Sequence, residues 1–212
     1  MSPIQSSASG VPAPFEILND EHRFIERLIS ALLAYVEQLG SWADPVDLGR
    51  FVDLIQGFAD ARHHEKEEDI LFEAMIAAGF PREMGPIAVM RMEHDQGRRL
   101  VAALRAVADK PGPWTAADKV TVRESAQDYA SLLRQHIVKE DTVLYPMARR
   151  TLSAEAVTRM EAQFDEVEGG EDARAELEGF LATANTLFEK YLGAPPLSLS
   201  ALSIRTMATP TT

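Results

Sequence analysis

Apolar residues recur along this chain at alternating spacings of four and three, the period of a helix that buries one face. Four long stretches show this pattern, and residues that begin or end helices separate them. The first stretch contains Leu18, His22, Ile25, Ile29, Leu32, Val36 and Leu39. The four predicted helices cover roughly residues 14–39, 45–78, 86–110 and 115–147. The pattern therefore predicts an all-α protein.

The turns between these helices contain residues with known roles at helix ends. Gly40 ends the first helix, and Asp44-Pro45 begins the second as an N-cap followed by a proline at the first helical position. Thr115 is a good N-cap for the fourth helix, which Pro146 is expected to bend or end. Because the turns are short, neighbouring helices should run antiparallel, as an up-down-up-down four-helix bundle.

The pattern changes after residue 151. Two further helices are predicted at about 153–168 and 171–191, separated by Gly169-Gly170. We expect them to cover the outside of the bundle or to form a homodimer with a second copy of the chain. The predicted divisions are a flexible lead (1–13), the bundle (14–151), a C-terminal helical extension (152–193) and a disordered tail (194–212).

Histidines interrupt the apolar faces of all four predicted bundle helices. Of the five histidines in the sequence, four lie in these faces: His22, His63, His94 and His136. A lone histidine on an apolar face is usually a hydrogen-bonded core residue. Here the four histidines reach similar heights in antiparallel helices that rise about 1.5 Å per residue. They therefore form one layer.

A short internal repeat adds two carboxylates to this layer. The segment His63 to Phe72 recurs as His136 to Tyr145, and in both copies a glutamate, Glu67 or Glu140, follows the histidine by four positions. This spacing places imidazole and carboxylate on one helix face, a single turn apart. Burying these groups without a cation would cost on the order of several kcal/mol for each unpaired ion. The six residues predict a dinuclear metal site.

The neighbours of these residues leave alternatives open. The repeat aligns His63 with His136, so we interpret His63 as the ligand and His64 as either a residue behind the ligands or a surface residue. Tyr129 lies two turns before His136 in the same face. It is either a core residue or a phenol directed at the site.

The remaining acids near the histidines are expected to be solvated. Glu21 and Glu93 each precede one of the four histidines, and adjacent residues of an α-helix point about 100° apart. Glu65, Glu68 and Asp69 are expected to form a solvated acidic face beside the first copy of the repeat, with pairing of Glu68 to a basic neighbour as the alternative.

Composition narrows the chemistry and the partners. Lys and Arg total 21 against 33 Asp and Glu, and the resulting net charge of -12 disfavours nucleic acid and anionic membranes. The sequence has no cysteine, which excludes disulfides, thiolate ligands and cysteine nucleophiles and leaves histidine and carboxylate as metal ligands. Because residues 1–14 lack the pattern of a signal peptide and no apolar run is long enough to span a membrane, we expect a cytoplasmic protein.

The order His22, His63-x-x-x-Glu67, His94 and His136-x-x-x-Glu140 resembles the bacterial hemerythrin-like proteins, the HHE cation-binding family. The resemblance covers roughly residues 15 to 150. It implies two non-haem iron ions with an oxo or hydroxo bridge, with Glu67 and Glu140 as bridging carboxylates and the four histidines as terminal ligands. Manganese and zinc are alternative metals for the same residues.

Two positions depart from the oxygen-carrying hemerythrins. Those proteins have a second histidine one turn after the third-helix ligand, where this sequence has Arg98, and an aspartate at the position of Asp141, where the internal repeat favours Glu140. The family branch that repairs iron–sulfur centres commonly adds a cysteine-containing N-terminal segment, so the lack of cysteine disfavours repair.

These features lead to two classes of function. Four imidazoles, two bridging carboxylates and a bridging oxygen fill about ten of roughly twelve positions on two octahedral irons. About two vacancies favour a protein that binds, senses or consumes dioxygen, hydrogen peroxide or nitric oxide, with peroxidase-like, catalase-like or nitric-oxide-consuming activity as the enzymatic form. The alternative is a non-catalytic oxygen- or iron-binding module that signals to a protein partner. A third possibility, outside these two classes, is a structural bundle whose site takes zinc or manganese.

Overall fold

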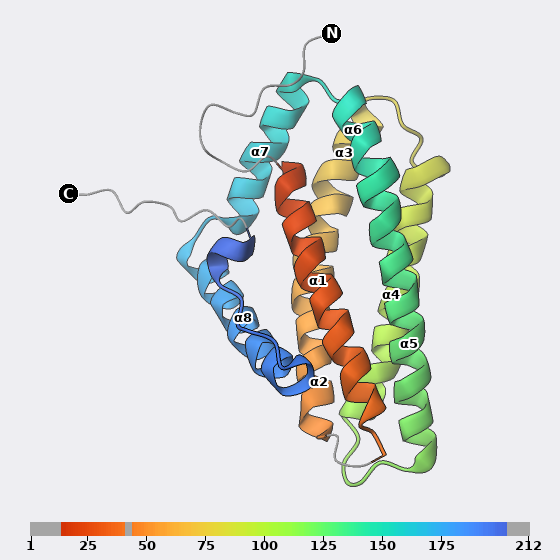
Figure 1. Ribbon diagram of the computed structural model, residues 1–212. Helices are drawn as coiled ribbons and strands as arrows, with labels where there is room; N and C mark the ends of the chain where they lie inside the picture. The colour runs from red at the N-terminus through yellow and green to blue at the C-terminus, as the bar shows by residue number, and fades with distance from the viewer. Residues whose placement is uncertain (1–13, 41–43, 203–212) are drawn as a thin grey trace, which may run out of the picture.

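The computed structural model describes residues 14–40 and 44–202, and the regular structure in these ranges is helical throughout (Figure 1). The all-α expectation is confirmed. The predicted flexible lead and the last ten residues of the predicted tail, 203–212, lie outside the described residues.

Four long helical rods form the bundle. They consist of α1 (Pro14–Glu37); α2 (Pro45–Leu54) continued by η1 (Ile55–His64), η2 (Lys66–Leu71) and α3 (Phe72–Ala77); α4 (Gly85–Ala108); and α5 (Ala116–Lys139) continued by η3 (Glu140–Leu144) and α6 (Tyr145–Thr151). In space α1 packs against α5, α5 against α4, α4 against α2 and η1, and η1 against α1 (Figure 1). This closes the four-helix arrangement that the apolar pattern predicted.

The predicted helix starts are stabilised as expected. The Asp44 side chain accepts a hydrogen bond from the Val46 amide, and Pro45 occupies the first helical position of α2. Thr115 forms a capping box with Asp118 at the start of α5. These contacts satisfy amide groups that a helix leaves unpaired in its first turn.

The second and fourth rods contain π-helical segments, which the apolar pattern did not predict. Both π-helical regions coincide with the internal repeat: η1 and η2 contain His63 and Glu67, and η3 begins at Glu140. Pro146 does not end the fourth rod, because it lies in the first turn of α6, where its missing N–H is tolerated. A π turn is wider than an α turn, so adjacent side chains are separated by a smaller angle.

Two apolar clusters fill the bundle and leave a polar layer between them. On α1, Leu18 belongs to the first cluster and Ile25 to the second, and His22 lies between them. On α4, His94 likewise lies between Met90 and Val101, which belong to the two clusters. The candidate ligands thus lie in the middle of the fold, where apolar layers above and below exclude water.

The C-terminal helices lie on one side of the bundle, next to α1. They are α7 (Ala154–Glu168) and α8 (Glu171–Leu192), and α8 contacts both α1 and α2 (Figure 1). Leu177, Leu181 and Phe188 of α8 share an apolar cluster with the bundle. The extension is therefore packed on its own chain; whether it also forms a homodimer stays a prediction.

Residues 194–202, which the sequence assigned to the tail, lie against α8 in the structure. The Leu197 amide donates to the Asn185 side chain on α8, and the Asn185 amide donates back to the Leu197 carbonyl. The short 3-10 helix η4 (Leu199–Leu202) follows. This reciprocal pair of hydrogen bonds and the apolar Leu197 and Leu199 hold the segment on the helix, because together they compensate for the lost chain entropy.

Candidate metal centre

Each bundle rod contributes side chains to one buried polar cluster. The contributing residues are His22 on α1, His63 and His64 on η1, Glu67 on η2, His94 on α4, His136 on α5 and Glu140 on η3. All seven are buried, and Glu67 and Glu140 are 0% exposed. The six residues predicted as ligands are therefore brought together, and His64 joins them.

The ligand atoms fall into two groups that share one carboxylate. One group is His64, Glu67, His94 and His136, and the other is His22, His63, Glu67 and Glu140. Within each group the nitrogen and oxygen atoms all lie within 4.8 Å of one another. Because Glu67 belongs to both groups, its carboxylate is placed to bridge two metal ions.

Every histidine of the cluster has an acid behind it. The Nδ1 atom of His22 lies 2.8 Å from Asp141, that of His63 lies 2.9 Å from Glu21, and that of His94 lies 2.7 Å from Glu68. His136 pairs with Glu93 at 2.9 Å and His64 with Asp60 at 3.3 Å in the same way. A carboxylate on Nδ1 fixes the ring and leaves the Nε2 lone pair free for a metal.

These pairs correct the expectation that the acids are solvated. Glu21 is 1% exposed, and Glu93 and Glu68 are mostly buried against His136 and His94. The prediction failed because it considered each helix alone: an acid that points away from its own histidine points toward a histidine on the next helix. Glu65 and Asp69 are exposed, as predicted.

The backing acids repeat with the internal symmetry of the site. Glu21, which precedes His22, backs the histidine of the first repeat, and Glu93, which precedes His94, backs the histidine of the second. Glu68 and Asp141 each follow one of the two candidate ligand glutamates. Glu68 contacts Nδ1 of His94, and Asp141 contacts Nδ1 of His22. The Glu-His dipeptides at 21–22 and 93–94 were a sequence signal for this arrangement.

The free atoms of the cluster fit a metal ion. Among the described residues, His64 Nε2, Glu67 Oε2 and both oxygens of Glu140 are buried without a hydrogen-bond partner. The Nε2 atoms of His94 and His136 face each other at 2.9 Å, and each Nδ1 meets a carboxylate, so a cation beside the two Nε2 atoms would stabilise their lone pairs. Nitrogen and oxygen ligands without thiolates suit iron, manganese and zinc.

The charges of the cluster also favour a bound cation. Burial would lower the pKa of His22, but the hydrogen bond to Asp141 and the nearby Glu140 carboxylate raise it to about 10. Burial would also lower the pKa of His94, but the nearby Glu67 carboxylate and the hydrogen bond to Glu68 raise it to about 9. The buried carboxylates thus attract positive charge to these positions, which a divalent cation would supply.

His64 differs from the prediction that placed it behind the ligands or at the surface. Its ring is 4% exposed and stacks on His94 with centroids 3.8 Å apart, and His64 belongs to one of the two ligand groups. Burial lowers the pKa of His64 to about 3, so the ring is neutral and able to ligate. His64 thus supplies a fifth imidazole at a site where the sequence has Arg98 one turn after His94.

Tyr145, which the sequence reasoning missed, is the phenol inside the cluster. Its hydroxyl donates to Glu67 Oε1 at 2.6 Å and lies 3.2 Å from His22 Nε2. It is the aromatic residue that ends the second copy of the repeat, where the first copy has Phe72. This difference between the copies was the only sequence signal for it.

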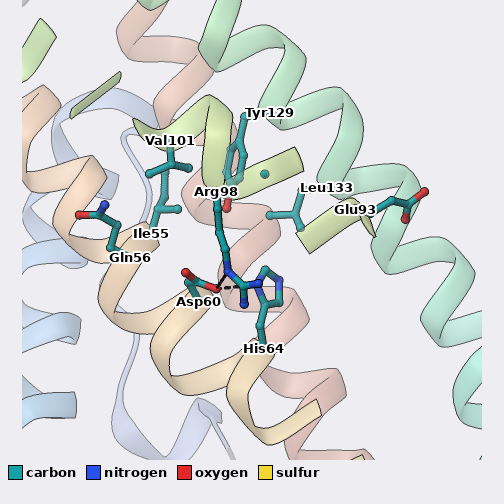
Figure 2. A pocket seen from close by; sticks show the side chains of 10 residues that line it. Ile55, Gln56, Asp60, His64, Glu93, Arg98, Val101, Tyr129 and Leu133 are labelled. Atoms are coloured by element: carbon teal, nitrogen blue, oxygen red, sulfur yellow. Dashed lines mark hydrogen bonds and ion pairs between the residues drawn. The ribbon is translucent and has the colours of Figure 1, made fainter. Parts of the chain in front are cut away.

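Tyr129 instead lines a cavity beside the cluster. The cavity, of about 60 Å³, lies between η1, α4 and α5 (Figure 2). Its wall includes His64, Gly97, Arg98 and Tyr129. Arg98 donates to Asp60 at 2.9 Å and to Glu68 at 2.8 Å, so one guanidinium holds the acids behind His64 and His94. The cavity is large enough for a small molecule.

Comparison with known proteins gives a family and two kinds of relative. The model of the hemerythrin HHE cation binding domain matches residues 13–148. Uncharacterised proteins of Mycobacterium tuberculosis (strain H37Rv) and Mycobacterium bovis are each 26% identical over 195 residues, which is 89% of this chain and 73% of the relative. The iron–sulfur cluster repair protein YtfE of Salmonella schwarzengrund is 36% identical over 89 residues, 41% of this chain and 40% of YtfE. No solved structure matches the chain.

One further observation concerns membranes. In the described ranges, every helix is too short or too polar to cross a bilayer.

Proposed function

Since this chain belongs to the hemerythrin HHE cation-binding family, we propose that its buried cluster holds two non-haem iron ions and binds, senses or consumes a small oxidant. The ligand class is dioxygen, hydrogen peroxide or nitric oxide. The observation that carries the proposal is the position of Glu67, whose carboxylate lies in both four-residue groups. A structural site for one ion would not need a shared carboxylate.

The two groups would hold their ions differently. His64, His94 and His136 offer three nitrogens to one ion, whereas His22 and His63 offer two to the other. If Glu140 bridges the two ions as the family resemblance implies, including His64 reduces the vacancies on the two ions from about two to about one. The vacancy argument from the sequence therefore no longer separates an enzyme from a carrier.

The remaining vacancy would lie on the side of His22 and His63, next to Tyr145. Bound iron would supply the redox chemistry there. The Tyr145 hydroxyl orients Glu67, and it is the nearest phenol to the two-nitrogen group. Tyr129, which the sequence offered as either a core residue or a phenol directed at the site, lines the cavity on the side of His64. The cavity gives a small molecule a place to approach the cluster (Figure 2).

Metal analysis of protein purified without oxygen tests this proposal. We expect about two irons per chain, and a change in the visible spectrum when air, hydrogen peroxide or nitric oxide is added. Turnover of peroxide or nitric oxide would identify an enzyme, and a reversible oxygen adduct without turnover would identify a carrier or sensor. Protein that binds one ion, or that takes zinc or manganese in preference to iron, would contradict the proposal.

Iron–sulfur cluster repair is a second candidate function, favoured by the similarity to YtfE. It predicts that the iron-loaded protein transfers iron to a damaged cluster. Restoration of activity in a nitrosylated iron–sulfur enzyme, compared with an equal amount of free Fe(II), would distinguish repair from oxidant binding.

A further inference from the structure

A buried ion cluster connects the C-terminal extension to the candidate metal centre. The Lys66 side chain is 0% exposed, and its ammonium lies 2.5 Å from Glu21 Oε1 and in contact with Glu168. The other oxygen of Glu21 meets Nδ1 of His63 at 2.9 Å. The contacts therefore run from α7 through two side chains to a candidate ligand.

Arg62 is a second buried cation beside the same two carboxylates, Glu21 and Glu168. Arg62 is 6% exposed, with Nε 3.9 Å from Glu21 and Nη2 3.7 Å from Glu168, and neither nitrogen has a hydrogen-bond partner among the described residues. Two buried cations thus face two carboxylates. Without Glu168, Glu21 alone would have to balance both cations, and unpaired buried charges are costly.

In the second copy of the repeat, the lysine that corresponds to Lys66 is exposed to solvent. Lys139 is the counterpart of Lys66 and contacts Glu93, which backs His136, as Lys66 contacts Glu21. However, the Lys139 side chain is 39% exposed, so water can balance its charge. The first copy is covered by α7, which lies beyond residue 148, where the match to the family ends.

Glu168 stands at the end of α7, where the chain turns sharply. Gly169 and Gly170 follow it, and Gly170 has φ 139°, a conformation that side chains disfavour. Phe164, one turn earlier on α7, places its ring 5.4 Å from the Lys66 ammonium. The helix end is thus fixed over Lys66 by an ion pair and a cation–π contact.

We propose that Glu168 is a positioning residue of the metal centre, through which the C-terminal extension sets how strongly the His22–His63 group holds its metal. This inference rests on the proposed function. Glu168 neutralises Lys66 and Arg62, so that Glu21 remains available to His63. Removing Glu168 draws Glu21 toward the two cations, weakens its hydrogen bond to His63 and makes His63 a poorer ligand.

The test is the variant Glu168→Gln, loaded anaerobically with Fe(II). We expect one of the two irons to bind about 10-fold or more weakly in competition with a chelator, the range typical of a lost partner behind a ligand. The other iron should bind as in the unchanged protein. The matched control is Glu166→Gln, an exposed acid of the same helix, which should leave both irons unaffected.

A double variant separates this charge effect from a loss of folding. In Lys66→Met/Glu168→Gln one uncompensated cation is gone, so the affinity for the weakened iron should recover in part, and circular dichroism should show folded protein throughout. Two irons bound with unchanged affinity by folded Glu168→Gln would overturn the inference. Equal weakening of both irons, without recovery in the double variant, would also overturn it, since that result means a structural role only. Failure of the unchanged protein to bind two irons would instead remove the proposed function and this inference with it.

Discussion

At the scale of single residues, the cluster is ordered by layers of alternating charge. Imidazoles surround the candidate metal position, and a carboxylate accepts a hydrogen bond from each imidazole. Most of these carboxylates in turn contact a cationic side chain, as Glu21 contacts Lys66 and Glu93 contacts Lys139. Arg98 serves two acids at once, Asp60 and Glu68. Such layers fix ring orientation and compensate buried charge, which the apolar surroundings would otherwise penalise.

We expect His64 to bind the metal directly. The variant His64→Ala removes one of three nitrogens from its group, so we expect the iron content to fall from about two toward about one per chain. The control is Ile137→Ala, which changes the buried counterpart of His64 in the second copy of the repeat and should cost about 2–4 kcal/mol of stability while keeping both irons. Full iron content in His64→Ala would restore the interpretation of His64 as a residue behind the ligands.

Tyr145 should affect the reaction of the centre more than its metal content. In Tyr145→Phe, the buried Glu67 Oε1 loses the hydrogen bond that the Tyr145 hydroxyl donates. We therefore expect an altered visible spectrum and a slower reaction with peroxide, while the iron content stays nearly unchanged. Stopped-flow absorption measures both. Tyr129→Phe, the matched control at the cavity, should have the smaller effect; the reverse order would assign the phenol of the site to Tyr129.

At the scale of helices, the π-helical segments explain how adjacent residues reach the same centre. On an α-helix His63 and His64 would diverge by about 100°. The wider turns of η1 and η2 reduce this divergence, so that His63 joins one ligand group and His64 the other. Wider turns are a locally unfavourable form of helix, which is found mainly where a site requires it.

The docking of α8 depends on Asp47 of α2. Its buried carboxylate accepts hydrogen bonds from Lys190 and Tyr191 of α8, and Asp47→Asn should lower the free energy of unfolding by about 2 kcal/mol. Chemical denaturation measures the change. Asp53→Asn, at an exposed acid of the same helix, should change stability by less than about 0.5 kcal/mol; a similar loss in both variants would mean that Asp47 does not anchor α8.

The contribution of Asp47 also has a pH dependence. Burial alone would raise the pKa of Asp47, but hydrogen bonds from Lys190, Tyr191 and Arg50 lower it. A lowered pKa means that the stabilisation is fully present above the unfolded value of about 3.9 and is lost as the pH falls through the folded value. The stability difference between the protein and Asp47→Asn should therefore shrink below about pH 4.

At the scale of the whole molecule, the metal should hold the two halves of the core together. The ligand layer separates two apolar clusters, and without a cation its carboxylates repel each other while its free nitrogens stay buried. Removal of metal by a chelator should lower the melting temperature, and hydrogen exchange should increase most in η1, η2 and η3. An unchanged melting temperature, with protection intact in these segments, would show that the layer is stable by itself.

The sequence by itself determined the bundle and the core of the site. Helix periods, caps and turns depend on neighbours within one or two turns, so Asp44, Thr115 and the apolar faces could be interpreted from the chain alone. The repeat located the buried Glu67 and Glu140 because the same local geometry occurs twice. Family membership followed from the order of these residues.

Only the tertiary structure decided what surrounds those residues. Glu21 and Glu93 were assigned to the surface because helix geometry says where a side chain points but not which helix it meets. His64 became a candidate ligand because it lies in π-helical turns that the apolar pattern did not predict and because the bundle brings its ring against His94. Glu168 reaches Lys66 from a helix far along the chain, where no local pattern marks it. Charges are compensated between elements brought together by packing, and that pairing is a property of the fold.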